Sequence, residues 1–256
     1  MEIFKFFKKK SIDPIHPESR SIKNISFNAI AKNVLSEKQR SLKPLLEYLS
    51  QSSFLIWWTS IALQLWHRES IDFDFVTRWP NYSFYDIYTF CESNKLKISS
   101  ESIDDYRWIE KTKQDEIHII INNVPVTIMD FYRTVYKDQK VNIEGNKYIL
   151  WWLRTNSLRD LASMKLYAMI TREKWKDAVD LYFLMKTQNF TFDFLVELSK
   201  KNFVGLFRIE PVLETIFNGK WDKREKVTYI GELRPSDDVI ITFLQESALL
   251  YKKSHF

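Results

Sequence analysis

Glycine is scarce in this chain: 4 of its 256 residues are glycine, whereas 9 are tryptophan. Average glycine usage of about 7% would give roughly 18 residues in a chain of this length. Low-complexity tracts and internal repeats are also absent from the sequence. The imbalance is most conspicuous at Trp57-Trp58, where two indoles follow a short apolar segment.

Cysteine and long hydrophobic runs are equally rare. The single cysteine, Cys91, excludes an intramolecular disulfide framework and favours a reducing, cytoplasmic location. It lies in an aromatic segment, so we interpret it as a small core residue and not as a nucleophile. The basic residues 1–10 are not followed by the apolar segment of a signal peptide, and no apolar run reaches the ~18 residues that span a bilayer. We therefore expect neither a signal peptide nor a membrane anchor.

The composition is that of a folded protein, with 45% hydrophobic and 28% charged residues. A chain of this length forms one large domain or two modest ones. The net charge is +5 and the pI is about 9.0. This mild basicity suits a polyanionic substrate, but an ordinary lysine-rich surface explains it equally well.

The pattern of apolar residues divides the chain into three parts. Residues 1–27 lack sustained periodicity and are expected to form a poorly ordered lead-in. Residues 28–137 predict a mixed domain, with helices over 28–50, 60–67 and 84–92 and strands over 54–56, 71–76, 106–111, 116–121 and 125–132. Residues 138–256 predict a helical domain, with a hinge at 138–145 and helices over 158–170, 174–185, 192–202, 209–217 and 238–253. The predicted fold class is therefore α+β, a small mixed sheet followed by a mostly helical C-terminal half.

Two aspartates alternate with apolar residues in the strand predicted at 71–76. Asp72 and Asp74 are two residues apart, so both carboxylates project from one face of the strand, roughly 6–7 Å apart at the backbone. Mg²⁺ prefers one or two carboxylates together with water and phosphate oxygens, which makes the pair a candidate metal site. Asp130, at the end of another alternating strand, is the candidate third carboxylate. Alone, the pattern is weak, because alternating aspartates more often form the solvated face of an edge strand.

The residues around the aspartates are more specific. The segment FLIWWTSIALQLWHRESIDFDFVT resembles the first motif of the AbiEii/AbiGii-type nucleotidyltransferase toxins, in which an apolar strand, Gly-Gly-Thr, a helix and Gly-His-Arg precede x-Ser-x-Asp-x-Asp-Phe. A second segment, DLASMKLYAMITREKWKDAVDLYFLM over residues 160–185, is similar to the helical motif of the same family. The two segments occur in the family's order. The resemblance implies the fold of the minimal nucleotidyltransferases over the predicted sheet and the start of the helical half.

The resemblance also implies roles for individual residues. Asp72 and Asp74 would be metal ligands, with Mg²⁺ or Mn²⁺ as the cofactor and an NTP as the substrate. Lys165 and Arg172 are seven residues apart, so they share a face if one helix runs through both. Asp180 is interpreted as a structural partner because its neighbours are core-like. The candidate catalytic residues are Asp72, Asp74, Asp130, Lys165 and Asp177, and the candidate nucleotide-binding residues are Trp57, Trp58, Thr59, Arg68, Ser70, Lys165, Arg172 and Lys176.

The chain departs from the family at three glycine positions, which are occupied by Trp57, Trp58 and Trp66. Glycine lets a backbone approach a phosphate closely and turn with positive φ, whereas an indole crowds both. Three interpretations remain open: an inactive homologue, a variant whose indoles point into the core, or UGA codons that the source organism reads as glycine. Trp151-Trp152 belong to the same question.

The leading functional expectation is a Mg²⁺-dependent nucleotidyltransferase that moves an NMP from an NTP onto an acceptor. As the toxin of a toxin–antitoxin or phage-defence pair, it would act on RNA such as tRNA or on a protein, and a separate antitoxin protein would be its partner. One alternative is a catalytically inactive interaction protein of the same fold. Another is a small-molecule nucleotidyltransferase of the antibiotic-modifying kind.

Overall fold

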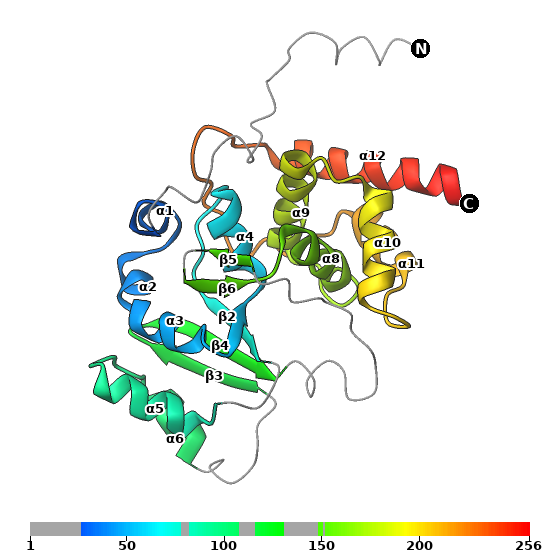
Figure 1. The fold of residues 1–256 in the computed structure, drawn as a ribbon. Coiled ribbons are helices and arrows are strands. Elements are labelled where there is room, and N and C mark those ends of the chain that lie inside the picture. The colour runs from blue at the N-terminus through cyan, green and yellow to red at the C-terminus, as the bar shows by residue number, and fades with distance from the viewer. Residues whose placement is uncertain (1–26, 78–81, 108–115, 131–147, 151) are drawn as a thin grey trace.

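A mixed β-sheet forms the centre of the computed structural model, which describes residues 27–77, 82–107, 116–130, 148–150 and 152–256 (Figure 1). Its six strands lie in the order β3-β4-β2-β1-β6-β5. β1 is antiparallel to β2 and parallel to β6, while β2 is parallel to β4, so the predicted mixed sheet is confirmed. The strands are β1 (Ser53–Leu55), β2 (Phe73–Thr77), β3 (Glu116–Ile121), β4 (Val124–Asp130), β5 (Tyr148–Leu150) and β6 (Leu153–Thr155).

The hairpin of β3 and β4 follows directly from the sequence. Ile117, Ile119 and Ile121 alternate with more exposed residues and are buried on one face of β3. Asn122 and Asn123 form the connecting turn with φ of 52° and 62°. Two-residue hairpin turns require positive φ at both positions, and asparagine tolerates that conformation better than most residues. The predicted turn is therefore confirmed.

The helices before the sheet are shorter than the sequence pattern suggests. The predicted helical region 28–50 contains α1 (Phe27–Val34), α2 (Glu37–Ser41) and α3 (Lys43–Leu49). Ser36 and Gln39 form a capping box that starts α2, and Pro44 lies in the first turn of α3, where its missing N–H costs nothing. α4 (Trp57–Leu65) then joins β1 to β2, and α5 (Phe84–Ser93) starts at the cap residue Ser83.

Two predictions for the first half are wrong. The strand expected at 106–111 overlaps the end of helix α6 (Ser100–Arg107), because the hydroxyl of Ser99 accepts a hydrogen bond from the Ser102 N–H at 3.2 Å and starts a helix there. The remaining residues of that prediction lie outside the described part of the chain. Strands β5 and β6 were assigned to the helical half, yet they extend the sheet beside β1. The described helical segment consequently starts at Leu158.

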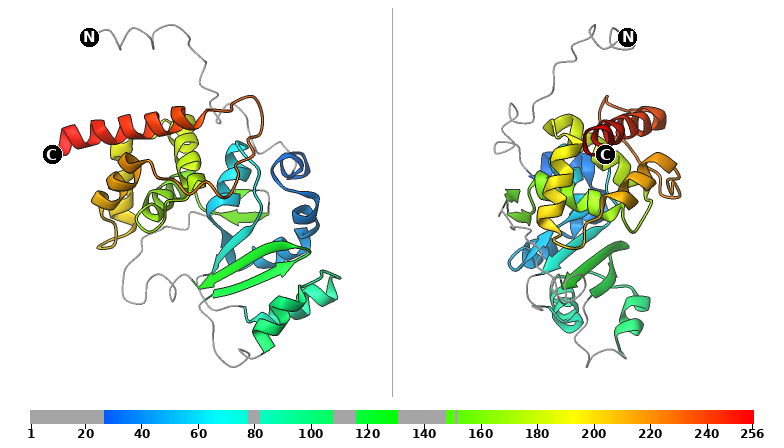
Figure 2. Two further views of the ribbon diagram at one scale, coloured as in Figure 1. Left: turned by 180° about the vertical axis from the view of Figure 1, so that it is seen from behind. Right: turned by 90° about the vertical axis from the view of Figure 1, so that its right-hand side faces the viewer.

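The C-terminal helices agree with the prediction to within a few residues at each end. They are α8 (Leu158–Ala168), α9 (Trp175–Gln188), α10 (Phe192–Asn202), α11 (Ile209–Asn218) and α12 (Asp237–His255). Figure 1 shows them grouped on one side of the sheet, while α5 and α6 lie at the far end beside β3. Seen from behind in Figure 2, α12 runs across this helical group. The predicted lead-in and hinge lie almost wholly outside the described residues, so the domain boundaries stay predictions.

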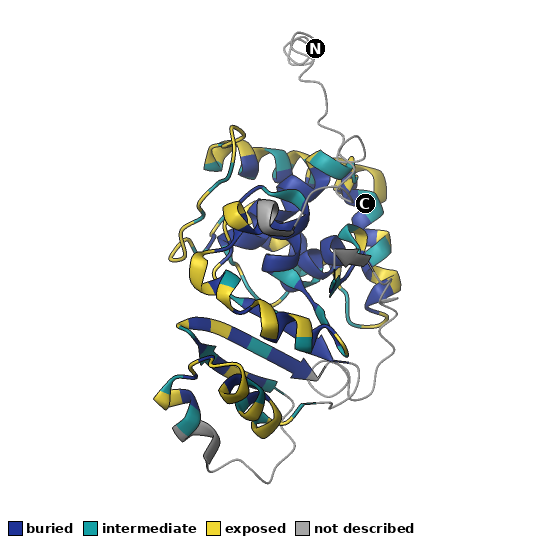
Figure 3. Cartoon of the chain, turned by 60° about the vertical axis from the view of Figure 1, so that its left-hand side comes forward, coloured by how far each residue is buried: buried dark blue, intermediate teal, exposed yellow. Residues whose placement is uncertain are grey.

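Two hydrophobic clusters cover the two faces of the sheet. One joins Phe73, Phe75 and the β3–β4 isoleucines to the N-terminal helices and α5, and it includes the buried Cys91. The other joins Val76 and Met129 to helices α8 to α12. In Figure 3, buried positions concentrate between the layers, and exposed positions lie on the outer helix faces. Because successive strand residues point to opposite faces, Asp74 lies on the face of β2 that carries Val76 and faces the helical group.

Candidate active site

Strand β2 and the residues before it present the two aspartates. β2 begins at Phe73, so Asp74 lies in the strand and Asp72 directly precedes it. Both residues are partly exposed, whereas Phe73 and Phe75 on the other face are fully buried. The main chain is held there by the Ile56 N–H, which donates to the Asp74 carbonyl at 2.9 Å. The predicted projection of both carboxylates from one face therefore agrees with the strand geometry.

Two buried hydroxyls hold the approach to β2. The Thr59 hydroxyl donates to the backbone carbonyl of Asp72 at 2.5 Å, and it lies 2.6 Å from the Ser70 hydroxyl. Both side chains are buried. Thr59 and Ser70, predicted to bind the nucleotide, thus position the main chain at Asp72 from inside the fold.

The two carboxylates disfavour each other's charge. Burial, and then the neighbouring charge of Asp72, raise the pKa of Asp74 to about 7. Burial also raises the pKa of Asp72, although Lys176 and Arg68 oppose that shift. A pair of carboxylates with unbalanced repulsion gains stability from a bound cation.

The donor set fits a Mg²⁺ ion that is completed by substrate. Among the residues that the structure describes, no three His, Cys, Asp or Glu side chains are grouped closely enough to hold a metal. Mg²⁺ is commonly bound by one or two carboxylates plus phosphate oxygens and water. Asp72 and Asp74 are the described residues that would hold such an ion.

A row of buried cations faces the aspartates from helices α8 and α9 and from the end of α4. Lys165 Nζ lies 3.0 Å from carboxylate oxygens of both Asp177 and Asp180. Arg172 donates from Nε to Asp177 at 3.0 Å, and Arg68 donates to Asp180 from Nε at 2.8 Å and from the terminal nitrogen Nη2 at 3.0 Å. Asp177 and Asp180, four residues before the buried Phe183 and Leu184 turn of α9, therefore orient three cations.

Asp180 is the centre of this network. It also lies 2.7 Å from Nε2 of His67, and its side chain is completely buried. The Arg68 and Lys165 charges overcome the opposing effect of burial and hold the pKa of Asp180 well below its ordinary value. The sequence interpretation of Asp180 as a structural partner and of His67 as a hydrogen-bonded structural imidazole agrees with these contacts.

The indole of Trp58 lies in the middle of the cations. The distance from its ring centroid is 3.3 Å to Lys165 Nζ, 5.0 Å to the Arg172 guanidinium carbon, 5.4 Å to that of Arg68 and 5.7 Å to Lys176 Nζ. The guanidinium of Arg172 also lies 4.4 Å from the Trp57 ring. The candidate nucleotide-binding residues are thus brought together, but around an aromatic ring.

Glu225 is a neighbour of the site that sequence reasoning missed. It accepts a short hydrogen bond from Lys176 and another from Lys174 at 3.2 Å, and its charge contributes to the raised pKa of Asp72. It comes from the extended segment before α12, where the Glu69 N–H donates to the Thr228 carbonyl at 2.9 Å. No local motif marks this segment, so only the fold places it at the site.

Asp130 lies at the predicted strand but further along it than the aspartate pair. β2 and β4 are neighbours, with Thr127 opposite Asp74 and Asp130 opposite Thr77. Its backbone is therefore three residues, or about 10 Å, beyond the level of Asp74. Its side chain is not among those that the structure describes, and its role stays a prediction.

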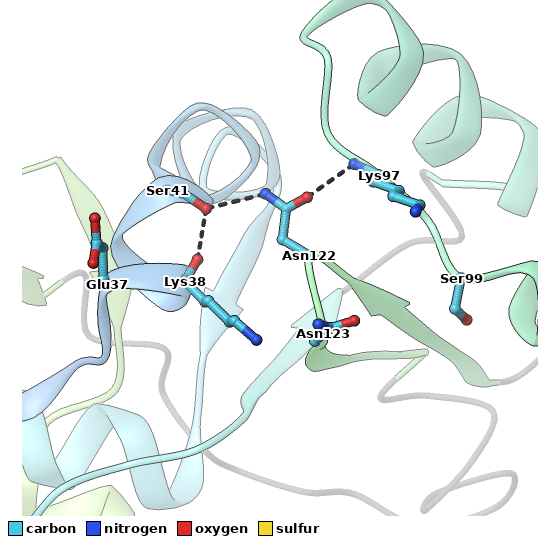
Figure 4. A pocket seen from close by; sticks show the side chains of 7 residues that line it. All are labelled: Glu37, Lys38, Ser41, Lys97, Ser99, Asn122 and Asn123. Carbon is cyan, nitrogen blue, oxygen red and sulfur yellow. Dashed lines mark hydrogen bonds between the residues drawn. The ribbon is translucent and has the colours of Figure 1, made fainter.

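Two hollows occur near the described surface. An apolar cavity of about 160 Å³ adjoins the site and is lined by Ile56, Trp57, Val76, Met129, Met164, Tyr167, Ala168, Thr171, Arg172 and Phe203. A larger, polar hollow of about 410 Å³ lies away from the aspartates, between α2 and the β3–β4 turn (Figure 4). There Asn122 accepts from the Lys97 N–H at 2.9 Å and donates to the Ser41 hydroxyl at 3.0 Å, which ties the hairpin to its neighbours.

The sheet, the aspartate pair on β2 and the facing cations are the arrangement expected of a nucleotidyltransferase. The sequence profile of the nucleotidyl transferase AbiEii toxin family, type IV toxin–antitoxin (TA) system, matches residues 59–226. The chain therefore belongs to the AbiEii family, and the resemblance noted from the sequence is confirmed.

Two further comparisons give more distant relatives. An uncharacterized protein of Aquifex aeolicus is 24% identical over 145 residues, which span 57% of this chain and 63% of that protein. A crystal structure of a protein from H. pylori that is assigned as a nucleotidyltransferase matches 86% of this chain and 97% of its own, with 17% identity and a TM-score of 0.48. No helix within the described residues is both long and apolar enough to cross a membrane.

Proposed function

We propose that this protein transfers an NMP from an NTP to a hydroxyl group of an acceptor and releases pyrophosphate. The observation that carries the proposal is the pair Asp72 and Asp74 on β2, facing the cations of α8 and α9. In the reaction, the acceptor oxygen forms a bond to the α-phosphorus while the bond from that phosphorus to the bridging oxygen breaks. Pyrophosphate leaves with the electron pair of that bond.

Each group has a defined task in this scheme. A divalent ion held by Asp72 and Asp74 supplies charge that stabilises the phosphates and the attacking oxygen. Lys165 and Arg172 neutralise charge on the triphosphate, and Asp177 holds both in place. The proton of the acceptor hydroxyl passes to a carboxylate, for which Asp130 is the proposed residue.

The apolar cavity beside Arg172 is the proposed place for the nucleobase. Engineered cavities of about 150 Å³ bind benzene, so the 160 Å³ found here suits one aromatic ring. The rings of Tyr167 and Phe203 stack on each other at 4.3 Å in its wall. Arg172 lines the cavity and also reaches Asp177, which connects the cavity to the cations.

The proposed acceptor is RNA, such as the 3′ end of tRNA, and the proposed setting is a toxin paired with a separate antitoxin. Family membership supports both parts. The test uses the chain as written and a version with glycine at 57, 58 and 66, each incubated with labelled NTPs, Mg²⁺ and total tRNA. We expect labelled tRNA from the glycine version, and growth arrest on expression that Asp72→Asn relieves. Label in a small molecule instead would favour an antibiotic-modifying type of enzyme, and no transfer together with undiminished growth would overturn the proposal.

A second function is favoured by the position of Trp58. An indole among the cations excludes a phosphate chain from the same space, as expected of an interaction protein that keeps the fold without catalysis. Calorimetric titration with GTP and ATP in the presence of Mg²⁺ separates the two functions. Micromolar, Mg²⁺-dependent binding by the protein with its natural residues supports the enzyme, and absence of binding supports the scaffold.

A further inference from the structure

Two tryptophans at the site have backbone conformations that bulky L-residues rarely adopt. φ is 56° at Trp57 and 55° at Trp66. In this left-handed region the β-carbon approaches the backbone too closely, and glycine alone escapes the penalty. Apart from the two tryptophans, the described non-glycine residues with positive φ are Lys95 and the asparagines 122, 123 and 189. Asparagine is the residue that tolerates this region best after glycine.

The ends of three helices allow a direct comparison. Helix α4 ends at Trp66, whose N–H donates to the Ala62 carbonyl at 2.8 Å. Helix α11 ends at Gly219 with φ 61°, and its N–H donates to the Thr215 carbonyl at 3.3 Å. Helix α9 ends in the same left-handed region at Asn189, with φ 53°. Glycine and asparagine are the usual residues at this cap, whereas tryptophan is not. Trp66 thus occupies a glycine cap.

Trp58 has no positive φ, but its side chain occupies a charged space. Four cations surround the ring at 3.3 to 5.7 Å from its centroid. An aromatic face attracts a cation weakly compared with the oxygens of a phosphate, which Lys and Arg bind through charge-assisted hydrogen bonds. If residue 58 is glycine, this space opens between the cations and the two aspartates.

Other tryptophans of the chain behave differently. Trp175 and Trp221 are buried, and their rings pack edge to face at 6.3 Å in the core. Neither has a positive φ. These two are therefore true tryptophans by packing and conformation, and they provide an internal control.

We infer that residues 57, 58 and 66 are glycine in the natural protein, encoded by UGA codons, and that the space filled here by the Trp58 indole binds a polyphosphate chain. The first part stands on backbone geometry and on the count of 4 glycines against 9 tryptophans. The second part rests on the proposed function and names the phosphate position within that site.

The codons and the mass of the natural protein test the first part. We expect UGA at positions 57, 58 and 66 and UGG at 175 and 221. Peptides of the protein isolated from its own host should contain glycine at the first three positions and tryptophan at the other two. A UGG codon or a tryptophan mass at any of the first three positions overturns the inference.

Binding of inorganic triphosphate tests the second part without any transfer reaction. We expect the full-length glycine version to bind triphosphate at least tenfold more tightly than the chain with three tryptophans, and Arg172→Gln in the glycine version to reverse most of that gain. Trp58→Ala alone, with the other two tryptophans kept, should recover part of the binding. Equal affinities for all versions overturn the phosphate position. Triphosphate binding without transfer of label would leave this position intact and reject the proposed activity, so the two failures are distinguishable.

Discussion

The ammonium group of Lys165 is enclosed on three sides: Nζ lies 3.0 Å from both Asp177 and Asp180 and 3.3 Å from the centroid of the Trp58 ring. Its side chain is 1% exposed. Burial lowers the pKa of Lys165, and the two aspartates oppose that shift. Two of the three sides are anionic and belong to α9. The third is neutral, and it is the side on which a phosphate would complete the shell.

Asp180 should contribute more to stability than any surface carboxylate. Asp180→Asn leaves the buried Arg68 and Lys165 with one fewer carboxylate, so we expect a loss of about 3–5 kcal/mol in the free energy of unfolding. The pKa of Asp180 is depressed in the fold, so its stabilisation is present above its unfolded value and is lost as the pH falls through the folded value. Urea unfolding at pH 7 and at pH 3 measures both effects.

Glu197 provides the matched control for this prediction. It pairs with Lys200 at 2.8 Å on the surface, with 64% of the Glu197 side chain exposed. Glu197→Gln should cost less than about 1 kcal/mol. Equal losses for the two variants would show that the buried network does not stabilise the fold.

Asp74 should have the opposite pH dependence. Its pKa is raised to about 7, first by burial and then by Asp72, so its charge is disfavoured in the folded state. The free energy of unfolding should fall as the pH rises from about 4 to about 7, because the folded state binds the extra proton in that range. Asp74→Asn should therefore raise stability at pH 8 by at least about 1 kcal/mol and change it little at pH 4.

Mg²⁺ separates this explanation from a general effect of the substitution. At pH 8 the ion should raise the thermal midpoint of the unsubstituted chain and leave that of Asp74→Asn nearly unchanged. A stabilisation of the two proteins by equal amounts would mean that Mg²⁺ binds elsewhere.

Local chemistry explains which parts of the fold are predictable from sequence. The β3–β4 hairpin was predicted because alternating isoleucines and Asn122-Asn123 specify it within a few residues. The helix at Ser100–Arg107 was missed because its start depends on the Ser99 cap, which reads equally well as a loop. Strands β5 and β6 are three residues each and have no periodicity to detect.

The site shows the same division. Asp72 and Asp74 are recognisable because a strand places residues two apart on one face. The contacts of Asp180 with Arg68 and His67, 112 and 113 residues away in sequence, arise only when α9 packs against α4. The position of the Trp58 ring among cations depends on the same packing. Spacing alone therefore indicated the residues of the site but not which of them touch.

The helix caps at residues 66 and 219 should respond in opposite directions. Gly219→Ala meets only the Gln245 side chain at 3.9 Å, so its cost is the left-handed backbone, about 1–2 kcal/mol. Trp66→Gly removes the same backbone cost and gives up only partly buried ring surface, so stability should be unchanged or higher. Trp175→Gly, in contrast, should lose at least about 3–5 kcal/mol, since it empties a core position. Thermal unfolding of the three variants checks the order, and a Trp66→Gly loss as large as that of Trp175→Gly would contradict it.

The cavity beside Arg172 predicts a separation of base binding from phosphate binding. Ala168 is buried and lines the cavity, so Ala168→Phe should fill it. In the glycine version, we expect this variant to raise the KM for the NTP about tenfold and to leave inorganic triphosphate binding unchanged. Steady-state kinetics and calorimetry measure the two effects. Loss of both together would place the base elsewhere or show that the substitution disturbs α8.

Nucleotidyl transfer itself is tested most directly by two labels in one nucleotide. The glycine version is incubated with Mg²⁺, RNA and NTP labelled either at the α- or at the γ-phosphorus. We predict that α-label enters the RNA, that γ-label leaves as pyrophosphate, and that Asp72→Asn or Asp74→Asn lowers both by at least about a thousandfold. Label from the γ-position in the acceptor, or transfer that persists without the two aspartates, would contradict nucleotidyl transfer at this site.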